Sequence, residues 1–125
     1  MNEKSEIGKK AEQLVADFWR KNGYIIAKMN YHSRYGEIDV IAENQKYVCF
    51  VEVKMRGENA IFTPAEAVDR RKQQKIILTA KSFMAKSNIP ELQPRFDVAE
   101  VYRYTDENGT KKFKLHYIKN AFYGI

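Results

Sequence analysis

The chain has 125 residues, a formal net charge of +6 and a sequence pI of about 9.4. This length fits one hydrophobic core, so we expect a single domain over residues 1–125. The one cysteine, Cys49, excludes an internal disulfide and a cysteine-rich zinc site, and its apolar surroundings indicate a small core residue.

The first ten residues, MNEKSEIGKK, are polar and charged, unlike a secretory signal. No apolar stretch approaches the roughly 20 residues that a membrane-spanning helix needs. We therefore expect a cytoplasmic protein with no membrane partner, and a reducing compartment also suits a chain without disulfides. The excess of positive charge favours a polyanionic partner such as nucleic acid.

The first half of the chain predicts one helix and three strands. Apolar residues at helical spacing indicate a helix from Ser5 to Lys21. Alternating or continuous apolar runs then predict three strands, over residues 24–31, 36–43 and 46–54. Asn44 and Gln45 predict a tight turn between the second and third of these strands.

The second half predicts a long helix and two more strands. The helix is expected from Thr63 to about Ser87, with Thr63 as its N-cap, Pro64 in its first turn and Glu66 as the capping acid. Two further strands are expected over residues 95–104 and 111–119. The order predicts an α/β domain with a mixed sheet of about five strands flanked by two main helices. A helical crossover also permits the fourth strand to run parallel to a central strand.

The predicted hairpin carries three charged residues, Asp39, Glu52 and Lys54, inside apolar runs. Because side chains alternate along a strand, Glu52 and Lys54 share one face of the third strand. A turn centred on Asn44-Gln45 would place Asp39 opposite Phe50. Asp39 would then lie on the face of Glu52 and diagonally from it, at roughly 7 Å.

Two carboxylates that lie close together repel each other, and a hard divalent cation such as Mg²⁺ relieves that repulsion. A bound metal makes water a better nucleophile, and Lys54 could orient that water or neutralise developing charge. The alternative is a solvated sheet face on which Asp39 pairs with Lys54. The runs IDVIA and VCFVEV count against this alternative, because they are nearly apolar on both faces, as in a covered central strand.

Asp39, twelve intervening residues and then Glu52-Val53-Lys54 resemble the D…ExK signature of the restriction-endonuclease-like superfamily. Together with Asn30-Tyr31, the segments GEIDVIA, FVEVKMR, RFDV and IKNAF resemble the YraN family of bacterial proteins, which is similar to Holliday-junction resolvases. The resemblance covers almost the whole chain. It implies a restriction-endonuclease-like core and a metal-dependent nuclease that acts on DNA.

The resemblance also implies roles for particular residues. Asp39 and Glu52 would bind Mg²⁺ or Mn²⁺ directly, the Val53 carbonyl would be a further ligand, and Lys54 would be the catalytic lysine. An additional acid on the first helix corresponds to Glu12, although this chain has Ala11 where family members often have glycine.

Several neighbouring residues keep alternative interpretations. Glu12 could instead be a surface acid paired with Lys9 or Arg20. Glu37 could be a further ligand or could hold an arginine. Gln73 or Gln74 could help to position the site, or could lie on the surface of the second helix.

Candidate nucleic-acid contacts flank the acids in the sequence. Cationic and polar side chains there would supply phosphate attraction that weakens with salt. The candidates are His32, Arg34, Tyr35, Arg56, Arg70, Arg71 and Lys72. The run at 70–72, which Lys75 would extend, could equally be a solvated helix face. His116 lies in a predicted strand and is interpreted as structural.

The leading hypothesis is a metal-dependent nuclease that hydrolyses DNA phosphodiester bonds, on branched or junction DNA. Junction cleavage needs two active sites and therefore a homodimer. The terminal AFYGI is a candidate contact surface for that dimer, or else a cap on the core. The alternatives are a non-catalytic nucleic-acid-binding module on the same fold and a protein-interaction or assembly factor.

Overall fold

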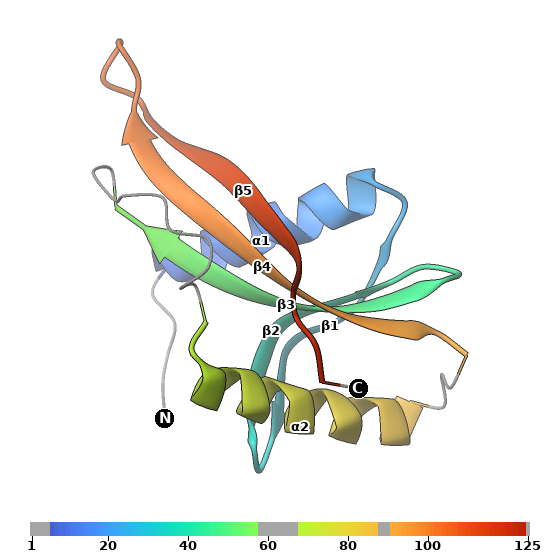
Figure 1. Ribbon diagram of the computed structural model, residues 1–125. Helices are drawn as coiled ribbons and strands as arrows, with labels where there is room; N and C mark the ends of the chain where they lie inside the picture. The colour runs from blue at the N-terminus through green and yellow to red at the C-terminus, as the bar shows by residue number, and fades with distance from the viewer. Residues whose placement is uncertain (1–5, 58–67, 88–90, 125) are drawn as a thin grey trace.

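The computed structural model describes residues 6–57, 68–87 and 91–124, and Figure 1 shows one sheet between two helices. The helices and strands are α1 (Glu6–Lys21), β1 (Ile25–Ser33), β2 (Gly36–Glu43), β3 (Tyr47–Arg56), α2 (Arg70–Ser87), β4 (Gln93–Thr105) and β5 (Lys111–Phe122). The α/β class and the mixed five-stranded sheet predicted from the sequence are confirmed.

The strands lie in the order β1-β2-β3-β4-β5. The first three form an antiparallel meander, and β4 and β5 form a second antiparallel pair. Strands β3 and β4 are parallel, as expected for strands joined by a crossover that contains α2. The central strand β3 therefore has a hydrogen-bonded neighbour on each side.

Each face of the sheet has its own hydrophobic core. On the α2 face, Phe50 of β3 packs among aromatic side chains that include Phe83 and Phe96. On the α1 face, Val51 of β3 packs with residues that include Trp19. Both faces of β3 are thus covered, which explains its nearly continuous apolar sequence.

Cys49 lies in the core on the α1 face, as the sequence indicated, and is fully buried. Burial raises the pKa of its thiol to about 12, so the thiol is protonated at neutral pH.

The hairpin register expected from a turn centred on Asn44-Gln45 is wrong. Val40 pairs with Val51 and Ile41 pairs with Phe50, so Asp39 is level with Glu52 rather than diagonal to it. The shift is by two residues, which leaves both acids on the same face.

The cause of the shift is the loop at Asn44. The Asn44 side-chain oxygen accepts hydrogen bonds from the backbone N–H of Lys46, at 2.9 Å, and of Tyr47, at 2.7 Å. The Asn44 N–H donates to the Tyr47 carbonyl at 3.0 Å. Asn44 and Tyr47 thus face each other with Gln45 and Lys46 between them, so the turn is centred one residue later than expected and the register shifts by two.

The expected start of α2 is also corrected. Its described part begins at Arg70, and Val68 and Asp69 are not helical. The Asp69 carboxylate accepts the Lys72 N–H at 2.8 Å and its carbonyl accepts the Gln73 N–H at 2.9 Å, so Asp69 is the N-cap. The expected capping residues, Thr63, Pro64 and Glu66, lie outside the described residues.

The C-terminal segment contributes to the core. Phe122 is buried and stacks on Phe96 with ring centroids 5.0 Å apart, whereas Tyr123 is 80% exposed. A Cβ added at Gly124 would clash with the side chain of Ile77 on α2, so this segment packs tightly against the helix. The segment therefore caps the α2-side core and leaves one tyrosine outside it.

Candidate metal centre

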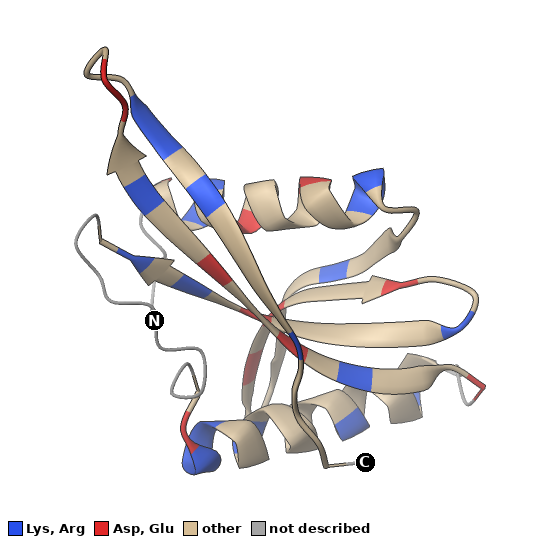
Figure 2. Ribbon diagram, turned by 45° about the horizontal axis from the view of Figure 1, so that its top comes forward, with Lys and Arg blue, Asp and Glu red and all other residues tan. Residues whose placement is uncertain are grey.

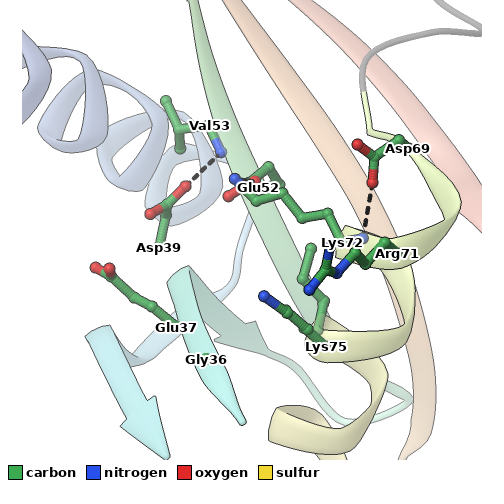
Figure 3. Close-up of a pocket in the computed structure, with 10 residues that line it drawn as sticks. Gly36, Glu37, Asp39, Glu52, Val53, Asp69, Arg71, Lys72 and Lys75 are labelled. Carbon is green, nitrogen blue, oxygen red and sulfur yellow. Dashed lines mark hydrogen bonds and ion pairs between the residues drawn. The ribbon is translucent and has the colours of Figure 1, made fainter.

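The two acids of the hairpin lie where β2 and β3 separate. Backbone pairing between these strands ends at Val40 and Val51. At the next level the Asp39 carboxylate accepts a hydrogen bond from the Val53 N–H at 2.8 Å. The side chain thus replaces a backbone partner, and the strands open into a notch beside Glu52 (Figure 3).

The strand on the other side of Asp39 is kinked at the same level. Asn30 of β1 lies between the pairs Met29–Val40 and Tyr31–Ile38, so it is opposite Asp39. Its φ of 51° is in the left-handed region, which asparagine tolerates better than most residues. Residues two apart in a regular strand share a face, but here Met29 packs in the α1-side core and Tyr31 packs in the α2-side core. The kink at Asn30 therefore breaks the alternation of side chains.

Asp39 and Glu52 are each 6% exposed. Burial is the main cause that raises the pKa of Glu52, to about 8, and the hydrogen bond and negative charge of Asp39 raise it further. The ion pair with Lys72 acts in the opposite direction. At neutral pH the pair of acids therefore holds a proton, and a divalent cation that bound both carboxylates would displace it.

A cavity of about 760 Å³ lies beside the two acids. The described residues that line it are Gly36, Glu37, Asp39, Glu52, Val53, Asp69, Arg71, Lys72, Lys75 and Ile76. In Figure 3 the acids of β2 and β3 face the cations of α2 across this space. The cavity thus combines an acidic wall with a basic one.

The basic wall is the first turn of α2. This turn contains Arg70, Arg71 and Lys72 and no acid. Cations are unfavourable at a helix N-terminus, where the helix dipole is already positive. Nearby anions, Glu52 and the capping Asp69, compensate part of this charge. The same concentration of positive charge favours the binding of phosphate.

Two lysines of α2 face the acids, in addition to the candidate Lys54 of β3. Lys72 forms an ion pair with Glu52, and Lys75 also lines the cavity. Lys54 follows Glu52 on β3, is half-buried and lies in register with Glu100 of β4, and it is not among the described residues that line the cavity. The sequence marked Lys72 only as a nucleic-acid contact, because no local pattern reveals a partner 20 residues away.

Glu12 is buried, at 3% exposed, and is therefore not a surface acid. It accepts a hydrogen bond of 3.1 Å from the Asn30 side chain, and Arg20 pairs with Asp17 instead. Since Asn30 lies opposite Asp39, Glu12 reaches the strand pair at the level of the candidate ligands. Within the described ranges, no group of three His, Cys, Asp or Glu side chains forms a complete metal cage.

The acids present nevertheless fit a divalent ion. Mg²⁺ and Mn²⁺ prefer oxygen ligands, and Mg²⁺ keeps several waters, so two carboxylates are sufficient. The buried pair Asp39–Glu52 in an open cavity meets this requirement. Glu37 also lines the cavity, and its carboxylate lies 3.9 Å from His32 Nε2. The Gln73 amide donates to the Val68 carbonyl at 2.9 Å, which supports the start of α2.

The predicted nucleic-acid contacts lie in different parts of the structure. Arg71 and Lys72 line the cavity, whereas Arg70 is exposed next to it. At the end of the β1–β2 hairpin, the Arg34 guanidinium carbon lies 4.9 Å from the centroid of the Tyr35 ring. Arg34 Nη2 also donates a hydrogen bond to the Tyr35 hydroxyl at 2.7 Å.

His32 and Arg56 differ in their environments. The side chain of His32 is 70% exposed. Arg56 donates to the fully buried Glu100 through Nε and pairs with it through Nη2, each at 3.0 Å. His116 Nδ1 lies 3.3 Å from the same carboxylate. Arg56 thus has a structural partner that the sequence did not reveal.

The protein is thus an α/β domain with a five-stranded mixed sheet. Its cavity holds a buried pair of carboxylates that face the cationic N-terminus of a helix. Residues 11–101 match the model of the Uncharacterised protein family UPF0102. The chain belongs to this family, the YraN family that the sequence resembled.

Curated relatives cover almost the whole chain. A UPF0102 protein of Caldanaerobacter subterraneus subsp. tengcongensis is 40% identical over 119 residues, which are 95% of this chain and 96% of the relative. A UPF0102 protein of Desulforapulum autotrophicum is 40% identical over 121 residues, 97% of this chain and 96% of the relative. A UPF0102 protein of Clostridium botulinum is 41% identical over 118 residues, 94% of each chain. Neither of the two described helices is long and apolar enough to cross a membrane.

Proposed function

We propose that this protein is a metal-dependent nuclease that hydrolyses DNA phosphodiester bonds in the cavity between β2, β3 and α2. One observation carries the proposal: two buried carboxylates, Asp39 and Glu52, lie level with each other at the cavity and face the cationic start of α2. Two buried carboxylates side by side are costly, and a divalent cation bound to both would lower that cost.

Asp39 and Glu52 would hold Mg²⁺ or Mn²⁺, with the Val53 carbonyl and Glu12 as the further candidates. When bound, such an ion supplies positive charge beside the scissile phosphate and acidifies a water molecule. Glu52 would have to be ionised to hold such an ion, and the Val53 N–H orients the Asp39 carboxylate.

The cations of α2 act on the substrate in this proposal. Arg71 and Lys75 attract the phosphate oxygens, and Lys72 is positioned to exchange its contact with Glu52 for one with a phosphate. Negative charge that develops on the phosphate is stabilised by these fixed cations. Lys54 remains the candidate catalytic lysine of the ExK pattern, and Lys72 is the second candidate.

The test is a cleavage panel of labelled linear, single-stranded, flapped and four-way DNA with Mg²⁺ or Mn²⁺. Metal-dependent products that Asp39→Asn and Glu52→Gln abolish would support the proposal. Glu91→Gln is the matched control, because it removes the same charge from an exposed position outside the cavity. Cleavage unaffected by the two cavity substitutions would refute the assignment. Preferential cutting of four-way DNA by a dimer would support the junction substrate.

The second candidate is a non-catalytic nucleic-acid-binding module. The observation that favours it is the cluster of cations around the cavity, together with a ligand set smaller than three acids within the described residues. Binding that falls steeply with salt and yields no products would identify this module. A protein that neither binds nor cuts DNA would support the remaining alternative, a protein-interaction or assembly factor.

A further inference from the structure

We infer that a second groove, between the C-terminal half of α2 and the β1–β2 hairpin, binds an unpaired nucleotide of the DNA that enters the cavity. This inference rests on the proposed function and adds the class of substrate, namely DNA with a single-stranded segment beside the cutting site.

The groove has a volume of about 590 Å³. Its walls come from the hairpin end and from α2, and the residues that carry the argument are Arg34, Tyr35, Leu78, Lys81, Ser82 and Lys86. None of the described residues that line it is acidic, in contrast to the cavity at Asp39 and Glu52. The groove therefore fits an anion without a metal.

Side-chain hydrogen bonds hold the two walls together. The Ser33 hydroxyl donates to the Thr79 hydroxyl at 3.1 Å and accepts the Tyr35 N–H at 3.0 Å. The hydroxyls of Tyr31 and Ser82 lie 3.4 Å apart, and the Tyr31 ring packs edge-on against Phe83. The groove is thus built before any ligand arrives, which lowers the entropy lost on binding.

The groove also presents apolar surface to solvent. Leu78 is 42% exposed and Tyr35 is 36% exposed. Arg34 lies over the Tyr35 ring, so a cation and an aromatic face stand together. Aromatic faces with nearby cations bind unpaired bases by stacking while the cations hold the phosphates. A paired duplex hides its base faces and gains only the phosphate contacts.

One stripe of α2 joins the groove to the metal cavity. Arg71, Lys75, Leu78, Ser82 and Lys86 follow one another at intervals of three or four residues and so share one face of the helix. Arg71 and Ser82 are roughly 16 Å apart along the helix axis. Figure 2 shows Lys and Arg at the N-terminal end of α2 and again further along it. A single strand could therefore run from the cavity into the groove.

The test measures DNA binding without metal, so that nothing can be cut. Fluorescence anisotropy compares a short labelled duplex with the same duplex carrying a single-stranded extension, in EDTA. We expect the extension to tighten binding roughly tenfold, as for one stacked base. The double substitution Tyr35→Ala with Leu78→Ala should abolish this preference without changing the charge, and Tyr35→Phe should keep it.

Lys81→Gln should weaken binding of the extended duplex more than Lys9→Gln, an equal charge change on exposed α1. Thermal unfolding of each variant checks that the fold persists. Equal effects of the two lysine substitutions, or a preference that survives loss of Tyr35 and Leu78, would overturn the inference. A protein that never cuts DNA but keeps the preference would refute the nuclease and leave the groove assignment intact.

Discussion

The Asp39 carboxylate accepts a 2.8 Å hydrogen bond from the backbone N–H of Val53, the residue that follows Glu52. This bond joins β2 to β3 just past the end of their backbone pairing. Asp39 therefore has a structural role in addition to its proposed role as a ligand, and substitutions must separate the two.

Asp39→Ala should destabilise the protein by about 1–3 kcal/mol, because it leaves the part-buried Val53 N–H without its acceptor. Asp39→Asn keeps an oxygen at the same position and should lose much less stability. Urea denaturation of both variants measures the difference. Equal stability losses in the two variants would show that the hydrogen bond contributes little.

The stability of the protein should depend on the ionisation of Glu52. Its pKa rises from 4.5 to about 8 on folding, so the folded state retains a proton that the unfolded state releases. This retained proton contributes fully to the free energy of unfolding below pH 4.5, and the contribution is lost as the pH rises through 8. We expect Glu52→Gln to be more stable than the wild type at pH 9, by on the order of a few kcal/mol.

At pH 4 both Glu52 and the glutamine that replaces it are uncharged, so the two proteins should have similar free energies of unfolding. Denaturation curves at pH 4, 6.5 and 9 test this dependence. Glu91→Gln is the control and should show no such trend. A wild type that gains stability relative to Glu52→Gln as the pH rises would contradict the raised pKa.

Binding of Mn²⁺ should release a proton below pH 8, because the metal and the proton compete for Glu52. The apparent affinity should then rise by up to about tenfold per pH unit between pH 6 and 8. Calorimetry in two buffers of different ionisation enthalpy counts the released protons. Affinity that does not change with pH would exclude Glu52 as the titrating ligand.

Lys72→Met should raise the pKa of Glu52 further, because the ion pair with Lys72 lowers it. In the proposed nuclease, the rising limb of the pH profile of cleavage should therefore move to higher pH. Lys9→Gln removes a charge from an exposed position on α1 and should leave the profile in place. Lys54→Met, compared in the same assay, decides which lysine is catalytic. Substitution of the catalytic lysine should reduce cleavage at every pH, by about 10²-fold.

Arg56→Met should destabilise the protein by roughly 3 kcal/mol, because it leaves the fully buried Glu100 without its main cation. His116 Nδ1, which lies 3.3 Å from the same carboxylate, is a weaker substitute for the arginine. Chemical denaturation measures the loss, and DNA binding by the folded variant should fall no more than in Lys9→Gln, an equal charge change on exposed α1. A stable variant with much weaker DNA binding would restore Arg56 as a nucleic-acid contact.

Local patterns were sufficient for much of the fold. The range of β2 and the C-terminal end of α1 match the sequence analysis, because alternation and helical spacing depend on neighbours along the chain. The start of α2 was misplaced, because the sequence offers both Thr63 and Asp69 as acceptable N-caps and no local pattern distinguishes them.

The sequence by itself determined the order of the elements, the two covered faces of β3 and the shared face of Asp39 and Glu52. The shared face of the two acids depends on the period of two along a strand, which survives a register shift of two residues. Only the tertiary structure decided that the acids are level, that Lys72 pairs with Glu52, and that Arg56 pairs with Glu100. Such contacts join segments up to 44 residues apart, and their geometry depends on loop conformation and packing rather than on any local pattern.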